Sequence, residues 1–470
     1  MFAFKPVILW TDALIFLLVA AVAVFAAYAR RREHLRDPWR QVMRSGLGMS
    51  AVVVLAAYGA VALLDSLHFR PALQADSRGR VQFASEMLSV FDLMVTPLRI
   101  RTEKTYSAPL ATHLYAKETL QLLDGTMARV FPRLQFGGVH LQDPGRERTG
   151  DILRTTLKAA AAGILVWLMM VLGLAGWLAR RWRLPYAAAL TRMAGGHSDL
   201  PWKAVLLTAG LLVLLTAWLI ALAPLYHVLG TDKVGQDVLY QTLKSIRTGL
   251  VIGTLTTLVM LPFAVLLGIM AGFFKGWIDD TVQYLYTTLN AIPGVLLIAA
   301  AVLMLQVYID TRPELFPTQQ ERADLRLLFL CIILGVTNWT GLCRLLRGEA
   351  LKLSAVDFIQ AAAALGVSRG RIITRHMVPN VMHIVLISLV LDFSGLVLAE
   401  AVLSYVGVGV DPVMNSWGNM INAARLEMAR EPMVWWSLTA AFIFMFVLVL
   451  AANIFSDAVR DAFDPRLRKQ

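Results

Sequence analysis

The sequence is poor in charged residues and in cysteine. Only 16% of its 470 residues are Asp, Glu, Lys or Arg, whereas soluble domains carry about 25%. The two cysteines, Cys331 and Cys343, lie in or near one apolar stretch of a single predicted helix, so we expect no disulfide between them. Because 57% of the residues are hydrophobic and the mean hydropathy is +0.62, the composition predicts an integral membrane protein.

The sequence also lacks the short motifs that mark common active sites. It contains no G-x-x-x-x-G-K-[ST] phosphate loop, no H-E-x-x-H or paired-cysteine metal site and no convincing G-x-S-x-G motif. A membrane hydrolase would need a nucleophile and a base on facing helices, and four of the eight histidines fall at or near predicted helix ends. We therefore expect no catalytic residue and no metal site, and any ATP chemistry must come from another polypeptide.

Nine apolar stretches are long enough to cross a bilayer, which takes about 20 residues. They cover 6–29, 47–65, 157–179, 203–226, 246–272, 281–307, 326–345, 380–406 and 433–456. We expect the first to be a retained helix, because it is too long for a signal peptide and Arg30, Arg31 and Arg32 follow it instead of preceding it. The predicted fold class is all-α, with about nine transmembrane helices.

The basic residues cluster beside the ends of these spans. The net charge is +12, but this clustering is typical of the positive-inside rule and argues against nucleic-acid binding. The clusters are Arg30, Arg31, Arg32, Arg36, Arg40 and Arg44; Arg180, Arg181 and Arg183; Arg344, Arg347, Lys352, Arg369, Arg371 and Arg375; and Arg460, Arg466, Arg468 and Lys469. With nine spans, all four fall on one side, which we predict to be cytoplasmic. The N-terminus is then outside and the C-terminus inside.

Hydrophilic stretches divide the chain into four parts. These are two transmembrane helices in 1–65, a hydrophilic segment in 66–152, a third helix and cytoplasmic linker in 153–202, and six spans in 203–470. Segment 66–152 follows the second span, so it is expected outside the cytoplasm. Its apolar pattern, which includes Val130, Phe131 and Leu134, predicts a small extracytoplasmic domain; the alternative is a loose loop with patchy structure.

One cytoplasmic connection, 348–380, is long for a compact bundle, and such loops are usually functional. Ser354 and Asp357 predict a capped helix start, and Gly366 suits the left-handed position that ends a helix. Ser368 is expected to cap a second short helix, which Pro379 is expected to stop. The segment is thus predicted to form two short helices joined by a glycine turn.

The first of these helices carries four successive alanines, 361–364. Small side chains permit the close approach of another protein surface, and Phe358 and Leu365 offer apolar anchors beside them. The alternative is a helix lying on anionic lipid, but that helix would need bulky apolar residues along one face. The composition therefore favours docking against a protein.

This stretch resembles the coupling motif of ABC importer permeases, which reads E-A-A, three residues, G, nine residues, then I-x-L-P. The matching positions are Gln360, Ala361, Ala362, Gly366, Val378 and Pro379. Gln360 replaces the usual Glu, which keeps hydrogen bonding but removes the charge. His376 stands where the general pattern has Ile, although Arg375 to Asn380, R-H-x-x-P-N, is similar to the peptide-transporter branch.

Further matches to the C-type dipeptide and oligopeptide permeases run in the family's order over about 204–467. They are L-G-T-D at 229–232 with Gly235 and D-V-L at 237–239, A-G-F at 271–273 with G-W-I-D at 276–279, L-S-Y-V-G-V-G at 403–409 with S-W-G-N-M at 416–420, and V-R-D-A-F-D-P-R at 459–466. The first 200 residues match no general pattern of the family.

The resemblance implies a type I ABC importer permease core of six helices in the bacterial inner membrane, forming half of a pathway for peptides or similar small solutes. The implied partners are a second permease subunit in a heterodimer, two ATPase subunits that hold ATP and Mg, an extracytoplasmic substrate-binding protein and membrane lipid. The residues implied to couple to the ATPases are Asp357, Phe358, Gln360, Ala361, Ala362, Leu365, Gly366, Arg371, Arg375, His376 and Pro379. A secondary transporter or channel is the alternative, but it predicts inverted repeats or grouped mid-membrane ionisable residues, and neither is evident.

Four polar or helix-breaking residues within the spans are candidates to line the pathway. Asp392 and Glu400 lie in the eighth span, where a charge is expensive to bury, and a structural hydrogen bond to a neighbouring helix is the alternative role. Asn290 and Pro293 lie in the sixth span, where proline predicts a kink; shaping the helix is the alternative.

Overall fold

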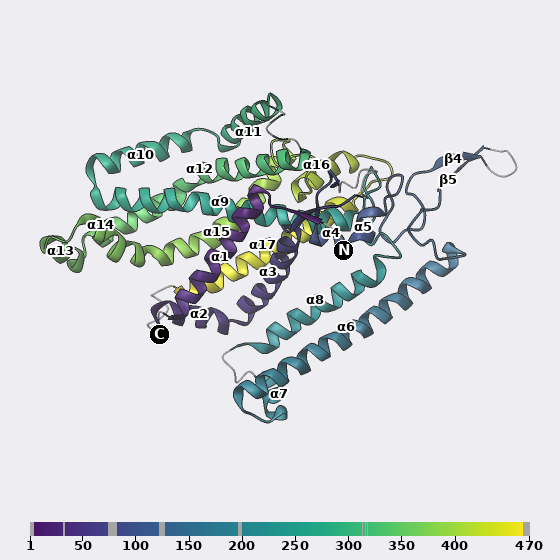
Figure 1. Ribbon diagram of the computed structural model, residues 1–470, viewed down its shortest axis with the longest axis horizontal. Helices are drawn as coiled ribbons and strands as arrows, with labels where there is room; N and C mark the ends of the chain where they lie inside the picture. The colour runs from purple at the N-terminus through teal and green to yellow at the C-terminus, as the bar shows by residue number, and fades with distance from the viewer. Residues whose placement is uncertain are drawn as a thin grey trace. The chain divides into compact units, whose positions relative to one another are not determined.

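The computed structural model describes residues 4–31, 33–73, 82–121, 127–195, 200–312, 314, 316 and 318–463. The elements of the N-terminal half are β1 (Phe4–Val7), α1 (Trp10–Arg31), α2 (Glu33–Arg44), α3 (Gly46–Asp65), β2 (His68–Pro71), β3 (Leu88–Ser89), α4 (Val90–Met94), α5 (Thr96–Ile100), β4 (Glu118–Gln121), β5 (Met127–Val130), α6 (Pro144–Trp182), α7 (Tyr186–Gly195) and α8 (Trp202–Leu222). Those that follow are α9 (Val238–Phe274), α10 (Gly276–Ala291), α11 (Gly294–Asp310), α12 (Gln319–Ser354), α13 (Asp357–Ala364), α14 (Arg369–Ile372), the π-helix η2 (Ile373–Met377), α15 (Val378–Tyr405), α16 (Trp417–Glu427) and α17 (Trp436–Phe463) (Figure 1).

The chain divides into two compact units, each made of segments distant in sequence. The first unit comprises Met1–Val7, Trp39–Thr248 and Asn415–Phe455. The second comprises Ile8–Pro38, Gly249–Met414 and Ser456–Gln470. Three helices, α2, α9 and α17, run from one unit into the other.

The helices confirm the predicted fold class. Eight described helices are long and apolar enough to cross a membrane, or nine spans if a bent pair counts as one. The span expected over 281–307 is broken into α10 and α11, which are bent by 85° at Ile292 and Pro293, in agreement with the kink that this proline predicts. Proline supplies no N–H for the helical ladder, so α10 ends and Pro293 begins a new helix.

In the first unit, α6 and α8 approach closely through glycine. A Cβ placed on Gly210 would lie 2.7 Å from Nε1 of Trp167, so only glycine leaves room for this indole. The same Nε1 donates a hydrogen bond to the carbonyl oxygen of Leu206 at 2.9 Å. Gly163 likewise faces Leu214 and Ala217 across the helix pair. Small residues let membrane helices pack backbone against backbone.

The segment between α3 and α6 packs against connections of the C-terminal half. Its secondary structure is short: β2 and β3 form an antiparallel sheet with the N-terminal strand β1, and β4 and β5 form a separate hairpin. Leu98 and Leu141 from this segment share one buried cluster with Tyr226, Val228 and Leu239. Leu134 is buried, whereas Val130 and Phe131 are exposed. The segment thus shares its hydrophobic core with the region between α8 and α9.

In the second unit, α9 and α12 meet along two glycines spaced four residues apart. A Cβ on Gly272 would lie 2.5 Å from that of Ala350, and one on Gly268 would lie 2.8 Å from the carbonyl oxygen of Cys343. Both cysteines are free and buried. The N-terminal helix α1 also belongs to this unit, where the backbone N–H of Thr11 donates to Oδ2 of Asp324 on α12 at 3.2 Å.

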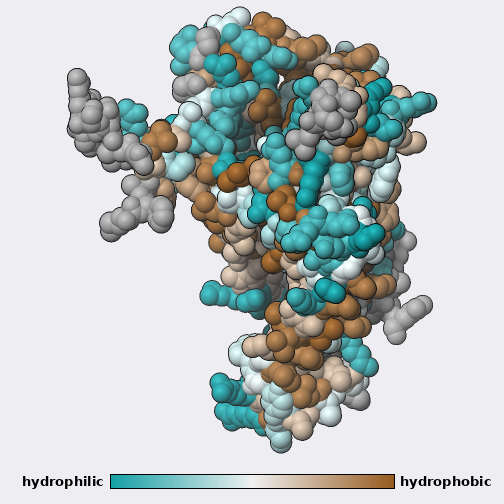
Figure 2. Space-filling view, turned by 90° about the vertical axis from the view of Figure 1, so that its right-hand side faces the viewer, coloured by the Kyte–Doolittle hydropathy of each residue, from teal (hydrophilic) through white to brown (hydrophobic). Residues whose placement is uncertain are grey.

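The surface around α6 and α8 is largely apolar. Figure 2 shows hydrophobic side chains gathered on the lower part of the face in view, where these helices lie. Exposed large hydrophobic residues there include Leu165, Met169, Leu207 and Leu211. Apolar side chains facing outward on two helices of this length are expected of helices that contact lipid.

Candidate functional site

The candidate coupling segment follows α12 in the second unit, at the end of the bundle formed there by α9, α12 and α15 (Figure 1). The predicted cap at Ser354 was wrong. Ser354 is the last residue of α12 and its hydroxyl donates to the carbonyl oxygen of Leu351 at 2.7 Å. Val356 precedes α13 instead, without a side-chain cap. Asp357 stays in the first turn, where its charge is favourable to the helix dipole.

The end of α13 agrees with the prediction for glycine. Gly366 has φ of +77°, the left-handed region that favours glycine. The N–H of Val367 donates to the carbonyl oxygen of Ala362, and that of Gly366 donates to Ala363, each at 3.1 Å. These two bonds form a Schellman motif, which turns the chain sharply after the helix.

The prediction that Pro379 stops the second short helix was wrong. Residues 369–405 run on as one helical stretch, through the π-helix η2 and into α15. Pro379 lies in the first turn of α15, and the N–H of Val378 donates to the carbonyl oxygen of Ile373, five residues back. This wider turn marks the change of register in front of the proline, which has no N–H to contribute. Ser368 does precede α14, but its side chain forms no capping hydrogen bond.

The segment has one anchored face and one exposed face. Ile359 and Ile372 are buried in a cluster with residues of α9 and α12, and Ala362 packs against that cluster. Leu365, by contrast, is 84% exposed and Phe358 is 47% exposed. Other predicted coupling residues on the surface are Asp357, Gln360, Ala361, Gly366, Arg371, Arg375 and Pro379. A short helix fixed by one side and apolar on the other is suited to dock with a protein.

Two contacts order the exposed face. The rings of Phe358 and His376 lie 6.2 Å apart between centroids, so they connect α13 to η2. The amide nitrogen of Gln360 donates to the carbonyl oxygen of Ala355 at 3.3 Å, which ties this side chain back to its own backbone. The amide that replaces the usual acid is therefore partly satisfied within the segment.

An ion pair at the base of the segment escaped the sequence analysis. Arg347 of α12 donates to Asp279 of α10 from Nε to Oδ1 at 2.5 Å and from Nη2 to Oδ2 at 2.7 Å. Two parallel hydrogen bonds between guanidinium and carboxylate fix both distance and orientation. The residues are 68 positions apart, and the only available signal was an acid in the G-W-I-D stretch after α9.

The candidate pathway residues are separated into two places in the second unit. Asn290 lies at the end of α10 beside Pro293, and its Oδ1 accepts a hydrogen bond from Thr340 of α12 at 3.0 Å. Glu400 is buried on α15, where its Oε1 accepts a hydrogen bond from Ser404 at 2.7 Å. Asp392 is half-buried two turns earlier on α15. A role in the pathway stays a prediction for all four.

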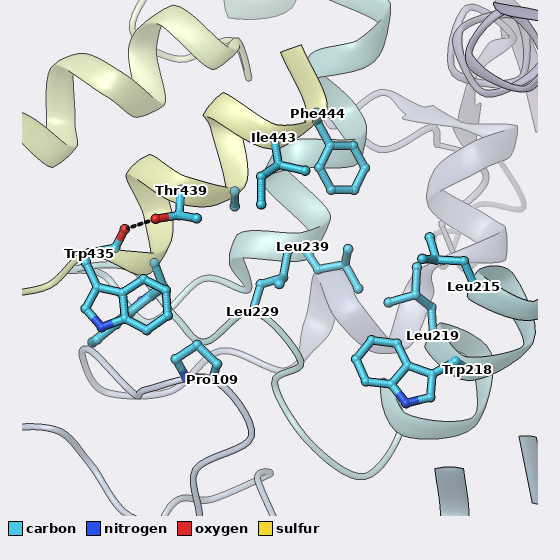
Figure 3. Close-up of a pocket in the computed structure, with 12 residues that line it drawn as sticks. Pro109, Leu215, Trp218, Leu219, Leu229, Leu239, Trp435, Thr439, Ile443 and Phe444 are labelled. Carbon is cyan, nitrogen blue, oxygen red and sulfur yellow. Dashed lines mark hydrogen bonds between the residues drawn. The ribbon is translucent and has the colours of Figure 1, made fainter. Parts of the chain in front are cut away.

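The first unit contains an apolar pocket of about 310 Å³ between α8 and α17 (Figure 3). It is lined by Pro109, Leu215, Trp218, Leu219, Leu229, Leu239, Trp435, Trp436, Thr439, Ala440, Ile443 and Phe444. Two of its indole N–H groups are already used, by Trp218 to the hydroxyl of Thr156 and by Trp436 to the carbonyl oxygen of Thr231. No lining residue is charged, so the pocket offers nothing that would recognise the ends of a peptide.

A buried ionisable cluster joins the segment after α3 to the connection between α8 and α9. Nδ1 of His227 lies 2.7 Å from Oδ2 of Asp237, and its Nε2 lies 3.4 Å from Oε1 of Glu103. Burial alone would lower the pKa of His227, but the two carboxylates outweigh it and raise the pKa to about 9. Glu103 also accepts hydrogen bonds from the backbone N–H groups of Gln135 and Phe136, and its pKa is lowered despite burial.

A second cluster of the same kind lies nearby in the first unit. Nζ of Lys244 contacts Asp65 at 2.7 Å and Asp92 at 3.0 Å. Ser89 also donates to Asp65, and Tyr240 donates to Asp92. These side chains satisfy one another, and among the described residues no group of His, Cys, Asp and Glu could hold a metal ion.

Many apolar spanning helices, with a short exposed helix fixed at the end of a bundle, define a multi-pass α-helical membrane protein. Residues 264–469 match the family described as binding-protein-dependent transport system inner membrane component. The oligopeptide transport system permease protein OppC of Mycobacterium tuberculosis is 33% identical over 242 residues, which are 52% of this chain and 77% of that protein. The chain belongs to this family of transport-system membrane components, and the predicted recognition is confirmed.

Other relatives cover the same share of the chain. OppC of Haemophilus influenzae is 29% identical over 243 residues, which are 52% of this chain and 71% of its own. The glutathione transport system permease protein GsiD of Pectobacterium atrosepticum is 29% identical over 244 residues, 52% of this chain and 73% of its own. A chain of the MetNI methionine ABC transporter in inward-facing conformations aligns with a TM-score of 0.35, 14% identity, and coverage of 48% of this chain and 96% of its own.

Proposed function

We propose that this chain is a permease subunit of an ATP-driven importer, and that it couples to separate ATPase subunits through the exposed face of α13. The observation that carries the proposal is the division of this short helix. Ile359 anchors it, while Phe358, Ala361 and Leu365 remain on the surface. Phe358 and Leu365, which are 47% and 84% exposed, together give this short helix an apolar surface that a protein partner would cover.

The rest of the assembly follows from the family. A second permease subunit would complete the pathway, two ATPase subunits would hold ATP and Mg, and an extracytoplasmic binding protein would deliver the solute. ATP binding and hydrolysis would then shift the helices between inward-open and outward-open states. The side that carries α13 would be cytoplasmic, in agreement with the exposed Arg371 and Arg375 beside it.

The proposed cargo is a peptide or a similar small solute. Its support is the relatives, which are named for the transport of oligopeptides, dipeptides and glutathione. Uptake of a labelled dipeptide by cells expressing the transporter, in competition with unlabelled di- and oligopeptides, tests this class. Competition by none of these peptides would contradict it.

Docking is tested by substitutions on the exposed face alone. Leu365→Asp and Ala361→Trp are expected to abolish co-purification of the ATPase subunits and solute uptake, because they place a charge or bulk at the contact. Ala361 is substituted instead of its neighbour Ala362, because Ala362 packs against the buried cluster that anchors the segment. Both variants should reach the membrane in normal amounts.

Matched controls use the same substitutions elsewhere. Leu426→Asp changes an exposed leucine of α16, and Ala187→Trp changes an exposed alanine of the short helix α7. Both controls should keep the ATPase subunits. Normal co-purification and uptake in Leu365→Asp and Ala361→Trp would exclude docking through this face.

A further inference from the structure

The end of α6 and the following α7 present a surface of one charge sign. Arg180, Arg181, Arg183 and Arg192 are all exposed, and we call this group the α6–α7 arginine surface. No Asp or Glu occurs in the sequence between Asp151 and Asp199. Along the chain, this stretch is therefore basic, and its nearest acids in sequence are Asp151 and Asp199.

Packing holds these arginines on the outside. Helix α7 folds back so that Met193 is buried with Ala175 and Leu178 of α6, and Trp182 and Trp202 pack against this cluster. Because α7 is fixed by its apolar side, Arg192 remains on the outer side of the helix. The arginines thus sit on a rigid turn.

Two of the guanidinium groups stack on tryptophan rings. The Cζ of Arg181 lies 5.4 Å from the ring centroid of Trp177, and that of Arg192 lies 5.0 Å from the ring centroid of Trp182. Cation–π contacts of this kind engage the flat face of the guanidinium and restrain its position. Trp177 is itself 55% exposed, next to the charged end of an apolar helix. Tryptophan at that level is typical of the boundary between hydrocarbon and headgroups.

The position of this surface along its helices matches that boundary. Residues 159–179 of α6 carry no charged side chain, and Arg180 is the first charge after them. Lys203 marks the corresponding end of α8, whose following residues carry no charged side chain as far as its last residue, Leu222. Both helices are long and apolar enough to cross a membrane.

The backbone at Arg183 adopts a left-handed conformation that arginine seldom takes. Arg183 ends α6 with φ of +54°, a left-handed conformation in which glycine or asparagine is usual. The residue therefore bears a backbone penalty that glycine would avoid, and its side chain adds a third guanidinium beside Arg180 and Arg181. A ligand for that guanidinium would explain the choice.

We propose that the α6–α7 arginine surface binds the phosphate headgroups of anionic phospholipids. Guanidinium groups donate paired hydrogen bonds to phosphate oxygens, and a net negative headgroup adds the attraction that a zwitterionic one lacks. The proposal goes beyond transport and does not depend on the ATPases or the solute.

Lipid retention by the purified full-length chain tests it. The detergent-solubilised chain is incubated with equal amounts of phosphatidylglycerol and phosphatidylcholine, repurified, and its retained lipids are counted by mass spectrometry. Phosphatidylglycerol should be enriched, and the enrichment should fall about fivefold for each of Arg180→Gln and Arg181→Gln. The matched control, Arg146→Gln with Arg148→Gln, removes two charges from the opposite end of the same helix, where Glu147 and Asp151 lie between and beside them.

Arg183→Gly separates lipid binding from damage to the fold. Glycine relieves the left-handed strain, so this variant should melt at a higher temperature in lipid-free detergent and yet retain less phosphatidylglycerol. Unchanged enrichment in the Arg180, Arg181 and Arg183 variants would overturn the proposal. An equal loss in the Arg146 and Arg148 control would also overturn it, because retention would then follow net charge and not this surface.

Discussion

Arg347 of α12 and Asp279 of α10 form an ion pair with two hydrogen bonds, near the end of α12 that leads into the candidate coupling segment, and their side chains are 23% and 13% exposed. The pair fixes the end of α12, from which Ser354 leads into α13. We expect it to hold the segment in position against the bundle.

Breaking this pair should destabilise the protein. Arg347→Met and Asp279→Asn should each lower the free energy of unfolding by about 2 kcal/mol, because each leaves a charged or polar partner unsatisfied. The double variant should lose less than the sum, which a double-mutant cycle measures as coupling. A thiol-reactive dye that detects exposure of the buried Cys331 and Cys343 on heating follows the melting.

The control for the pair is another ion pair of the same helix. Lys352 lies 3.1 Å from Glu349, but its side chain is 77% exposed. Lys352→Met should change stability by less than about 0.5 kcal/mol, since exposed pairs contribute little. A coupling energy near zero for Arg347 and Asp279 would show that their geometry adds nothing to stability.

Substitution of Gly272 should separate α9 from α12. A Cβ there would lie 2.6 Å from the carbonyl oxygen of Arg347 as well as against Ala350, and backbone atoms cannot move aside cheaply. Gly272→Ala should therefore lower stability by about 1–3 kcal/mol.

Gly341 on α12 provides the contrast, because a Cβ there meets no described atom within 4 Å. Gly341→Ala should leave the melting temperature unchanged or raise it slightly, since alanine is the better helix former. Equal melting temperatures for the two variants would refute the close approach of α9 and α12.

The cluster around His227 should make stability depend on pH. Its pKa rises from 6.5 to about 9 on folding, so the folded state binds the proton more tightly than the unfolded chain. The resulting stabilisation, about 3 kcal/mol, is fully present below about pH 6.5 and disappears as pH rises through about 9.

Comparison with His227→Gln isolates this contribution. The difference in melting temperature between the wild type and this variant should shrink from pH 6 to pH 10. His113→Gln, which changes an exposed histidine of the same unit, is measured alongside as the control. A pH-independent difference for His227→Gln would mean that the histidine is not held protonated by Asp237 and Glu103.

Local signals in the sequence were sufficient for part of this architecture. Hydropathy located the spans because lipid-facing and buried helices are both apolar, and Gly366 was predicted correctly because its left-handed turn depends only on neighbouring residues. Hydropathy alone averaged over the break at Pro293 and gave one span, whereas the proline itself indicated the kink, which the structure shows as a bend of 85°. The rule that proline stops a helix failed at Pro379, where a π-turn precedes the proline.

Contacts between distant residues could not be predicted in the same way. Arg347 and Asp279 lie on different helices, and His227 meets Glu103 only after the chain between them has folded back. The glycines at 268 and 272 did offer a readable signal, since this spacing is typical of close helix packing. Their partner, α12, became evident only from the structure.

The core that Leu98 and Leu141 share with Tyr226, Val228 and Leu239 limits how this protein can be exchanged with its relatives. A hybrid that joins residues 203–470 to the N-terminus of another permease would uncover these side chains and leave His227 without Glu103. Residues 82–143 and the connection at 224–237 should therefore be inherited, or transplanted, together.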